Sequence, residues 1–163
     1  MGEDKDLLPG DFRALAEFRY QIRKFLRFSE DAARAAGLEP QQHQLLLAVK
    51  GMPEGMRARI GEIAERLQIQ HHSTVELVDR LEQNGYVNRK RNDRDKREVI
   101  ITLTAKAERI LRELTLHHHE MLQTYGTELI ASLKKLMSTK DRARKEKPSN
   151  PVRVRIKAAA GDD

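Results

Sequence analysis

Apolar residues recur at helical spacing along most of the chain. In the N-terminal part this pattern predicts a long helix over residues 11–36, with Asp11 as its N-cap and Gly37 placed to end it. A second helix is expected over residues 40–50, whereas the polar residues 1–10 are expected to form a mobile lead. The apolar positions of the first helix are Leu15, Phe18, Ile22, Phe25 and Leu26.

The middle of the chain has the pattern of two short helices joined by a tight turn. Residues 60–67 carry apolar side chains at i, i+3, i+4 and i+7, which predicts a short amphipathic helix. Residues 68–70 break that pattern, and a second helix is expected from about His71 to Asn84, where Gly85 tolerates a left-handed cap. The apolar positions of the pair are Ile60, Ile63, Ala64, Leu67, Leu77, Val78 and Leu81.

Two strands are expected next, because helical spacing gives way to alternation. Tyr86–Arg91 and Glu98–Leu103 are the predicted strands, and residues 92–96 form a polar, highly charged turn between them. Helix, turn, helix and a two-stranded wing together predict a mainly α fold of the α+β winged-helix kind. A helix of such a unit can enter the major groove of DNA while the wing reaches the backbone or the minor groove.

The C-terminal part returns to helical spacing. Thr104 is expected to cap a helix that Gly126 interrupts, and a last helix is expected to end near residue 138. Residues 140–163 are expected to be a disordered basic tail, since they hold eight Lys and Arg against four Asp and Glu. That tail accounts for +4 of the formal net charge of +6, so the body of the chain is nearly balanced.

The candidate DNA-binding residues are polar side chains on the outer face of the second short helix and on the wing. Side chains of this kind can hydrogen-bond base edges or phosphates. They are Gln70, His71, His72, Ser73, Glu76, Arg80, Lys90, Arg94, Lys96 and Arg97. Asp79, inside the same helix, is expected to orient a wing arginine by an ion pair as readily as to act on DNA itself.

Residues 59–104 resemble the MarR family of bacterial transcriptional regulators, and flanking helices of matching number extend the likeness to roughly residues 10–139. The matching segments are Ile60-Gly-Glu-Ile-Ala-Glu-Arg-Leu67, Ser73-Thr-Val-Glu-Leu-Val-Asp-Arg-Leu-Glu-Gln-Asn-Gly-Tyr-Val87, Asn92-Asp-Arg-Asp-Lys-Arg97 and Val99-Ile-Ile-Thr-Leu-Thr104. The resemblance implies a MarR-like domain over residues 11–139. Its dimerisation helices would lie at about 11–36 and 105–138, and its winged helix-turn-helix at about 40–104.

The resemblance further implies a homodimer that binds a palindromic DNA operator and a repressor that releases DNA when a small-molecule effector binds. Arg97 would reach the minor groove. The chain departs from the family pattern in the reading helix, where Glu76 replaces a common basic residue and His71-His72 replace small hydroxyl residues. The resemblance therefore leaves open which bases are read.

Two alternatives remain open at this stage. The run His117-His118-His119 suggests a metal-sensing protein, but neighbouring helical residues point in different directions, so the three cannot hold one ion together. One of them could still meet His43 or His71, although no metal site and no cofactor are expected. The second alternative is a winged helix that binds proteins, which has no need of Arg80, Lys90, Arg94 and Arg97 as a basic reading face.

Other classes find little support in the sequence. The chain has no cysteine, which excludes disulfides and thiol chemistry, and it shows no nucleophile-base-acid set or phosphate-binding loop, so an enzyme is not expected. It has no apolar run of about 20 residues and no signal peptide, so a soluble cytoplasmic protein without a membrane partner is expected.

Overall fold

The computed structural model describes residues 8–91 and 98–145. Seven elements follow one another in the order α1, α2, α3, α4, β1, β2, α5. Their bounds are α1 Pro9–Ala35, α2 Pro40–Lys50, α3 Ile60–Leu67, α4 His71–Gln83, β1 Val87–Arg91, β2 Val99–Leu103 and α5 Ala105–Lys145. The predicted fold class, mainly helical with a small two-stranded sheet, is confirmed.

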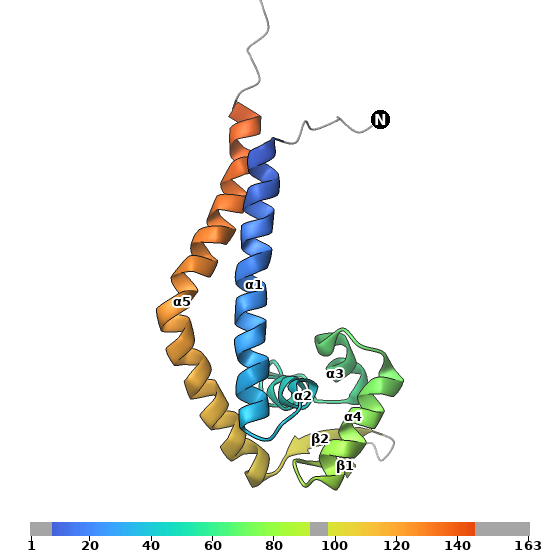
Figure 1. Cartoon of the computed structure of the whole chain (residues 1–163). Helices are drawn as coiled ribbons and strands as arrows, with labels where there is room; N and C mark the ends of the chain where they lie inside the picture. Colours follow the sequence, from blue (N-terminus) through green and yellow to red (C-terminus); the bar gives the residue numbers. More distant parts are fainter. Residues whose placement is uncertain (1–7, 92–97, 146–163) are drawn as a thin grey trace, which may run out of the picture.

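The molecule has two parts (Figure 1). The long helices α1 and α5 run antiparallel, side by side, and form a stalk that carries the start of α1 and the end of α5 at one end. At the other end lies a lobe built from α2, α3, α4, β1 and β2. The lobe therefore projects its helices away from a narrow two-helix support.

The start of α1 differs from the sequence prediction. The helix begins at Pro9 and not at Asp11, so Pro9 and Gly10 belong to the helix and not to the lead. Proline fits the first helical position, because its fixed φ suits a helix and its missing N–H would lack a helical partner there. Asp11 sits one turn in and accepts a hydrogen bond of 2.9 Å from the backbone N–H of Leu8.

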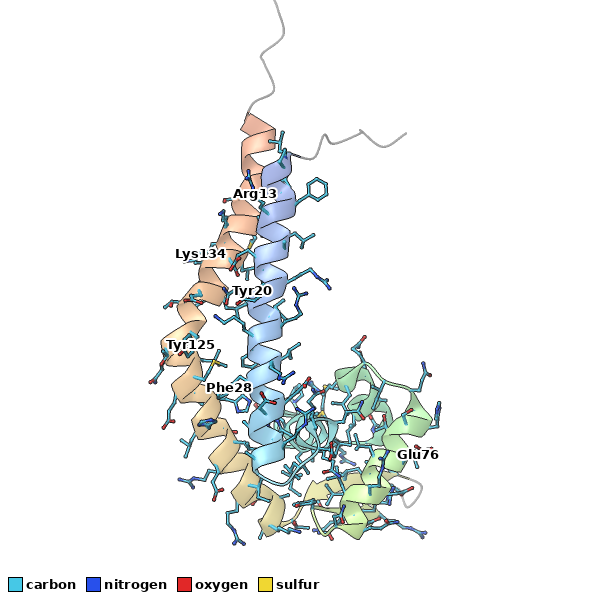
Figure 2. The ribbon with its side chains drawn as sticks, viewed as in Figure 1. Arg13, Tyr20, Phe28, Glu76, Tyr125 and Lys134 are labelled. Atoms are coloured by element: carbon cyan, nitrogen blue, oxygen red, sulfur yellow. The ribbon has the colours of Figure 1, made fainter. Side chains whose placement is uncertain are left out.

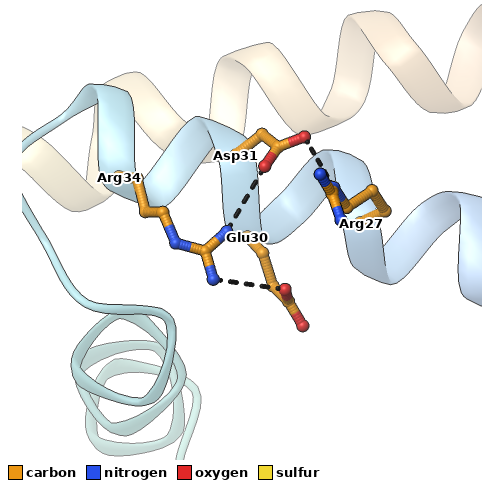
Figure 3. A network of polar contacts seen from close by, with 4 residues as sticks. All are labelled: Arg27, Glu30, Asp31 and Arg34. Carbon is orange, nitrogen blue, oxygen red and sulfur yellow. Dashed lines mark hydrogen bonds and ion pairs between the residues drawn. The ribbon is translucent and has the colours of Figure 1, made fainter.

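An exposed network of charges lines the last turns of α1 (Figure 3). Asp31 bridges Arg27 at 3.1 Å and Arg34 at 3.3 Å, and Glu30 lies 3.5 Å from Arg34. Pairs three and four residues apart face each other on a helix and each stabilise it by about 0.2–0.5 kcal/mol. The network therefore marks the solvent-facing side of α1.

The C-terminal half is one helix where two were predicted. α5 continues through Gly126 without interruption and on to Lys145. Gly126 is buried beside a pocket shared by α1 and α5, and the roughly 1 kcal/mol that glycine costs in a helix is too little to end α5 there. Residues 140–145 are accordingly helical and not part of a disordered tail, while residues 146–163 and 1–7 lie outside the described residues.

The core of the lobe is apolar and continuous with the base of the stalk. Leu45, Leu46, Ile63, Val78 and Leu81 are wholly buried within it. Ile63, Val78 and Leu81 are among the positions that helical spacing predicted to be apolar in α3 and α4, whereas no buried face had been predicted for α2. The start of α5 joins the same core through Ala107, Leu111 and Leu114. The lobe and the lower stalk are thus packed as one unit.

Candidate nucleic-acid interface

The turn between α3 and α4 sets how α4 is presented. Gln68 takes a left-handed conformation with φ 54°, and its side-chain amide donates to the carbonyl of Glu65 at 2.6 Å. The N–H of Ile69 then donates to the carbonyl of Ala64 at 3.1 Å. These bonds satisfy groups at the end of α3 that would otherwise lack partners, and they turn the chain sharply into α4.

One face of α4 is buried and the other is free. Thr74, Leu77, Val78 and Leu81 face the core. Gln70, His71, His72, Glu76 and Arg80 are exposed, as predicted, while Ser73 is half-buried and lies at the edge of the outer face. Figure 2 shows Glu76 on the outer side of α4, away from the stalk. The structure therefore leaves all five accessible, and His72, Glu76 and Arg80, spaced four residues apart, share one face of α4.

Gln70 precedes the first turn of α4 as its N-cap. Its carbonyl accepts the N–H of Thr74 at 3.0 Å and the Thr74 hydroxyl at 3.1 Å. Its side chain makes no capping hydrogen bond and is exposed. The side-chain amide of Gln70, which can donate and accept at a base edge, is available for that role.

The two strands form the stem of the wing. They pair antiparallel with Val87 opposite Leu103 and Arg91 opposite Val99. Lys90 and Arg91 are exposed on β1. The other predicted wing residues, Arg94, Lys96 and Arg97, lie outside the described residues.

Arg89 of β1 joins the wing to α4. Its guanidinium binds Asp79 and Glu82, and its backbone N–H donates to the Glu82 carboxylate at 3.0 Å. Partial burial opposes the charged form of Arg89, but the bonds to both carboxylates prevail and raise its pKa. The expected role of Asp79, to pair with a wing arginine, is thus found, with Arg89 as the partner.

Two further arginines flank the wing on the other side. Arg57 lies 2.6 Å from a carboxylate oxygen of Glu98, and Arg59 lies 3.5 Å from the other oxygen. Between them the carbonyl of Ala58 accepts the N–H of Ile101 at 2.8 Å, so this loop lies along the edge of β2. The sequence pattern did not predict the ion pairs of Arg57 and Arg59 with Glu98. Both arginines precede the helical pattern, and Glu98 reaches them only when β2 has folded against this loop.

The comparisons with known proteins match this architecture. Residues 36–98 match the model of the MarR family. The chain is 30% identical over 101 residues to the uncharacterized HTH-type transcriptional regulator YcgE of Bacillus subtilis (strain 168), covering 62% of this chain and 64% of that protein. It is 38% identical over 56 residues to YfiV, a regulator of the same description and strain, covering 34% of this chain and 35% of that protein.

Over residues 36–98 the chain is therefore similar to the MarR family. Its matches span about a third to two thirds of the length of these curated relatives. Among solved MarR folds, it aligns with AbsC from Streptomyces coelicolor at a TM-score of 0.65 and 19% identity, over 86% of this chain and 99% of AbsC. A mutant of MepR from S. aureus, solved bound to an oligodeoxyribonucleotide, aligns at a TM-score of 0.58 and 20% identity, over 75% of this chain and 94% of that chain. Identities this low establish the fold.

The histidines of the chain lie in two separate places. His71 and His72 lie on the outer face of α4, whereas His118 turns inward from α5 and meets His43 of α2 with 5.3 Å between ring centroids. His117 is exposed and stacks on Phe28 at 4.9 Å. Within the described ranges no three His, Cys, Asp or Glu side chains gather as metal ligands. Likewise, no described helix is long and apolar enough to cross a bilayer.

Proposed function

We propose that this chain is a DNA-binding transcriptional regulator that reads a duplex with α4. The observation that carries the proposal is the exposed polar face of α4 beside the exposed Lys90 and Arg91 of β1. A helix of this kind reads base edges in the major groove, and basic side chains next to it meet the phosphate backbone. The MepR mutant, solved with an oligodeoxyribonucleotide, supports the same use of the shared fold.

We further propose that the regulator works as a homodimer on a palindromic operator. The stalk leaves many large apolar side chains uncovered, and a second stalk would cover them. The exposed ones on α1 and α5 are Phe12, Leu15, Tyr20, Leu26, Leu116, Leu122, Tyr125, Ile130, Leu133 and Met137. A two-fold dimer presents two copies of α4, so its half-sites are inverted and about 10 bp apart, centre to centre.

The proposed mode of action is repression that a small apolar molecule relieves. A pocket of about 150 Å³ opens between α1 and α5, lined mainly by Phe25, Phe28, Met121, Leu122 and Tyr125. Figure 2 labels Phe28 on α1 and Tyr125 on α5 along this stretch of the stalk. A molecule seated there would change the spacing of α1 and α5, and with it the position of the lobe. This part of the proposal rests on the pocket and on the family.

The deciding experiment is selection of bound duplexes from random DNA, followed by titration of the selected sequence at one salt concentration. Arg80→Ala removes an exposed cation from α4 and is expected to weaken binding by about 1–3 kcal/mol. Arg13→Ala is the matched control, since Figure 2 shows Arg13 near the far end of the stalk. Selection of no sequence would reject the proposal in favour of a winged helix that binds proteins. Equal loss in both variants would reject α4 as the reading element.

A further inference from the structure

Two histidines meet where the lobe joins the stalk. His43 belongs to α2 and is buried, with 4% of its surface exposed. Its ring centroid lies 5.3 Å from that of His118 on α5. α2 is part of the lobe core through Leu45 and Leu46, so this ring contact crosses the boundary between lobe and stalk.

His118 can hold a proton without losing its partners. Its Nδ1 lies 2.6 Å from the carbonyl oxygen of Leu114, which only accepts, so Nδ1 carries a hydrogen. Its Nε2 lies 2.9 Å from the hydroxyl of Ser29, which can donate to a neutral ring or accept from a charged one. Rotation of one hydroxyl group therefore accommodates both protonation states of His118.

His43 has a different environment. Burial lowers its pKa, and the nearby His118 lowers it further. The groups of α1 in this cluster are uncharged: Ser29 and the rings of Phe25 and Phe28, which lie 6.1 and 5.5 Å from His118. The carboxylate of Glu120 lies 3.9 Å from His117 on an exposed part of α5. The described cluster therefore pairs His43 with another base and with no carboxylate.

We propose that the His43–His118 contact is an acid-sensitive link between lobe and stalk. While both rings are neutral, they pack together and hold α2 against α1 and α5. A proton on His43 must be buried beside His118, and the charge is better hydrated when α2 moves away from the stalk. Acid therefore favours an open form in which the lobe is no longer held at its present angle.

The direction of the effect follows from linkage. Well above the usual histidine value of about 6.5, both forms are neutral and the contact keeps its full strength. As the pH falls below that value, His43 takes up a proton more readily in the open form than in the closed form. The equilibrium therefore shifts from the closed form toward the open form. The ratio of open to closed molecules rises about tenfold for each unit by which the closed form lowers the pKa of His43.

The test uses the full chain without DNA between pH 8 and pH 5. NMR of the imidazole carbons gives the titration of each histidine, and amide hydrogen exchange gives protection factors for α2, corrected for the intrinsic effect of pH. We expect the pKa of His43 to lie below its usual range and the protection of α2 to fall on acidification. A pKa of His43 in the usual histidine range would overturn the proposal, and so would protection factors of α2 that do not change with pH.

Three variants separate this contact from general acid sensitivity. His43→Gln should abolish the pH dependence of α2 protection, and His118→Gln should reduce it, because burial of His43 persists. His119→Gln is the matched control from the same run of histidines, exposed on α5, and should behave as the parent. An unchanged acid response in His43→Gln counts against the link. Should His43→Gln fail to fold, the titration of His43 in the parent chain still decides.

The regulatory consequence rests on the proposed DNA binding and is measured separately. On acidification, affinity for the selected duplex at fixed salt should fall more in the parent and in His119→Gln than in His43→Gln. His71 and His72 on α4 are common to all three chains, so only the difference between the chains reports the link. Absence of DNA binding at every pH would reject the proposed function and leave the exchange result standing. Affinity that falls equally in all three chains would show that the link does not act on DNA binding.

Discussion

At the scale of single residues, Arg89 is the side chain that connects α4 to the wing. It binds Asp79 and Glu82, which lie three residues apart and hence on one face of α4. Without Arg89, both carboxylates would lose a cationic partner on the helix that we propose to enter DNA. The ion pairs therefore connect α4 to β1, and in the proposed complex they would also neutralise two acids close to the DNA backbone.

A double-mutant cycle measures this connection. Arg89→Ala and Asp79→Ala should each lower the free energy of unfolding, and the coupling between them should be about 0.5–1 kcal/mol, because both side chains are partly exposed. Urea denaturation of the parent, both single variants and the double variant gives the value. Lys90→Ala, next along β1 and exposed, is the control and should change stability by less than about 0.5 kcal/mol. Strictly additive losses would mean that the Arg89–Asp79 ion pair does not stabilise the contact between α4 and β1.

At the scale of elements, two glycines near helical segments have opposite effects. Gly85 ends α4 with φ +71°, its N–H donates to Glu82 at 2.9 Å, and the N–H of Tyr86 reaches back to Leu81 at 2.9 Å. That arrangement requires the left-handed conformation that glycine adopts freely. Gly126 instead has helical neighbours on both sides within α5. The sequence predicted a helix end at Gly85 and an interruption at Gly126, and only the helix end at Gly85 is present.

Alanine at each position distinguishes the two roles. Gly126→Ala should raise the free energy of unfolding by about 0.5–1 kcal/mol, since the new methyl group meets only the side chain of Leu122, at an ordinary 3.8 Å. Gly85→Ala should lower it by about 1–2 kcal/mol, because alanine is strained at positive φ. Both are measured by urea denaturation at one protein concentration. A destabilised Gly126→Ala would indicate that α5 bends or packs more closely there than in this structure.

At the scale of the whole molecule, the stalk is the part least able to stand alone. Small side chains of α1 such as Ala14 are buried, but large side chains of the stalk such as Phe12 and Leu133 are exposed. Exposed apolar area on this scale marks an interface. A second stalk would remove it from water at about 25 cal/mol per Å².

A charge placed on the stalk tests the dimer. Leu133→Glu should convert a stable dimer at micromolar concentration into monomers, because a carboxylate would be buried without a partner. Sedimentation equilibrium is the measurement. Met56→Glu is the matched control: this side chain is 47% exposed in the loop between α2 and α3, while Leu133 is 41% exposed. A parent chain that sediments as a monomer would contradict the dimer, and so would a Leu133→Glu variant that stays dimeric.

The sequence by itself determined the lobe. Its helices are short, amphipathic and bounded by turn-forming residues, and local spacing is enough to specify such units. The predicted cap of α5 is also present: the hydroxyl of Thr104 accepts a hydrogen bond of 3.3 Å from the N–H of Ala107. The outer face of α4 followed from the same spacing.

The tertiary structure decided what depends on residues far apart in the chain. Gly126 stays helical within α5, although glycine locally suggests an interruption. Arg89 was one of several basic residues near the wing until the fold placed it beside Asp79. His43 and His118 are 75 positions apart and acquire a shared environment only when α2 closes against the stalk. The spacing of apolar residues indicates which face of a helix is buried. Which side chains of different helices and strands contact each other depends on how these elements pack together.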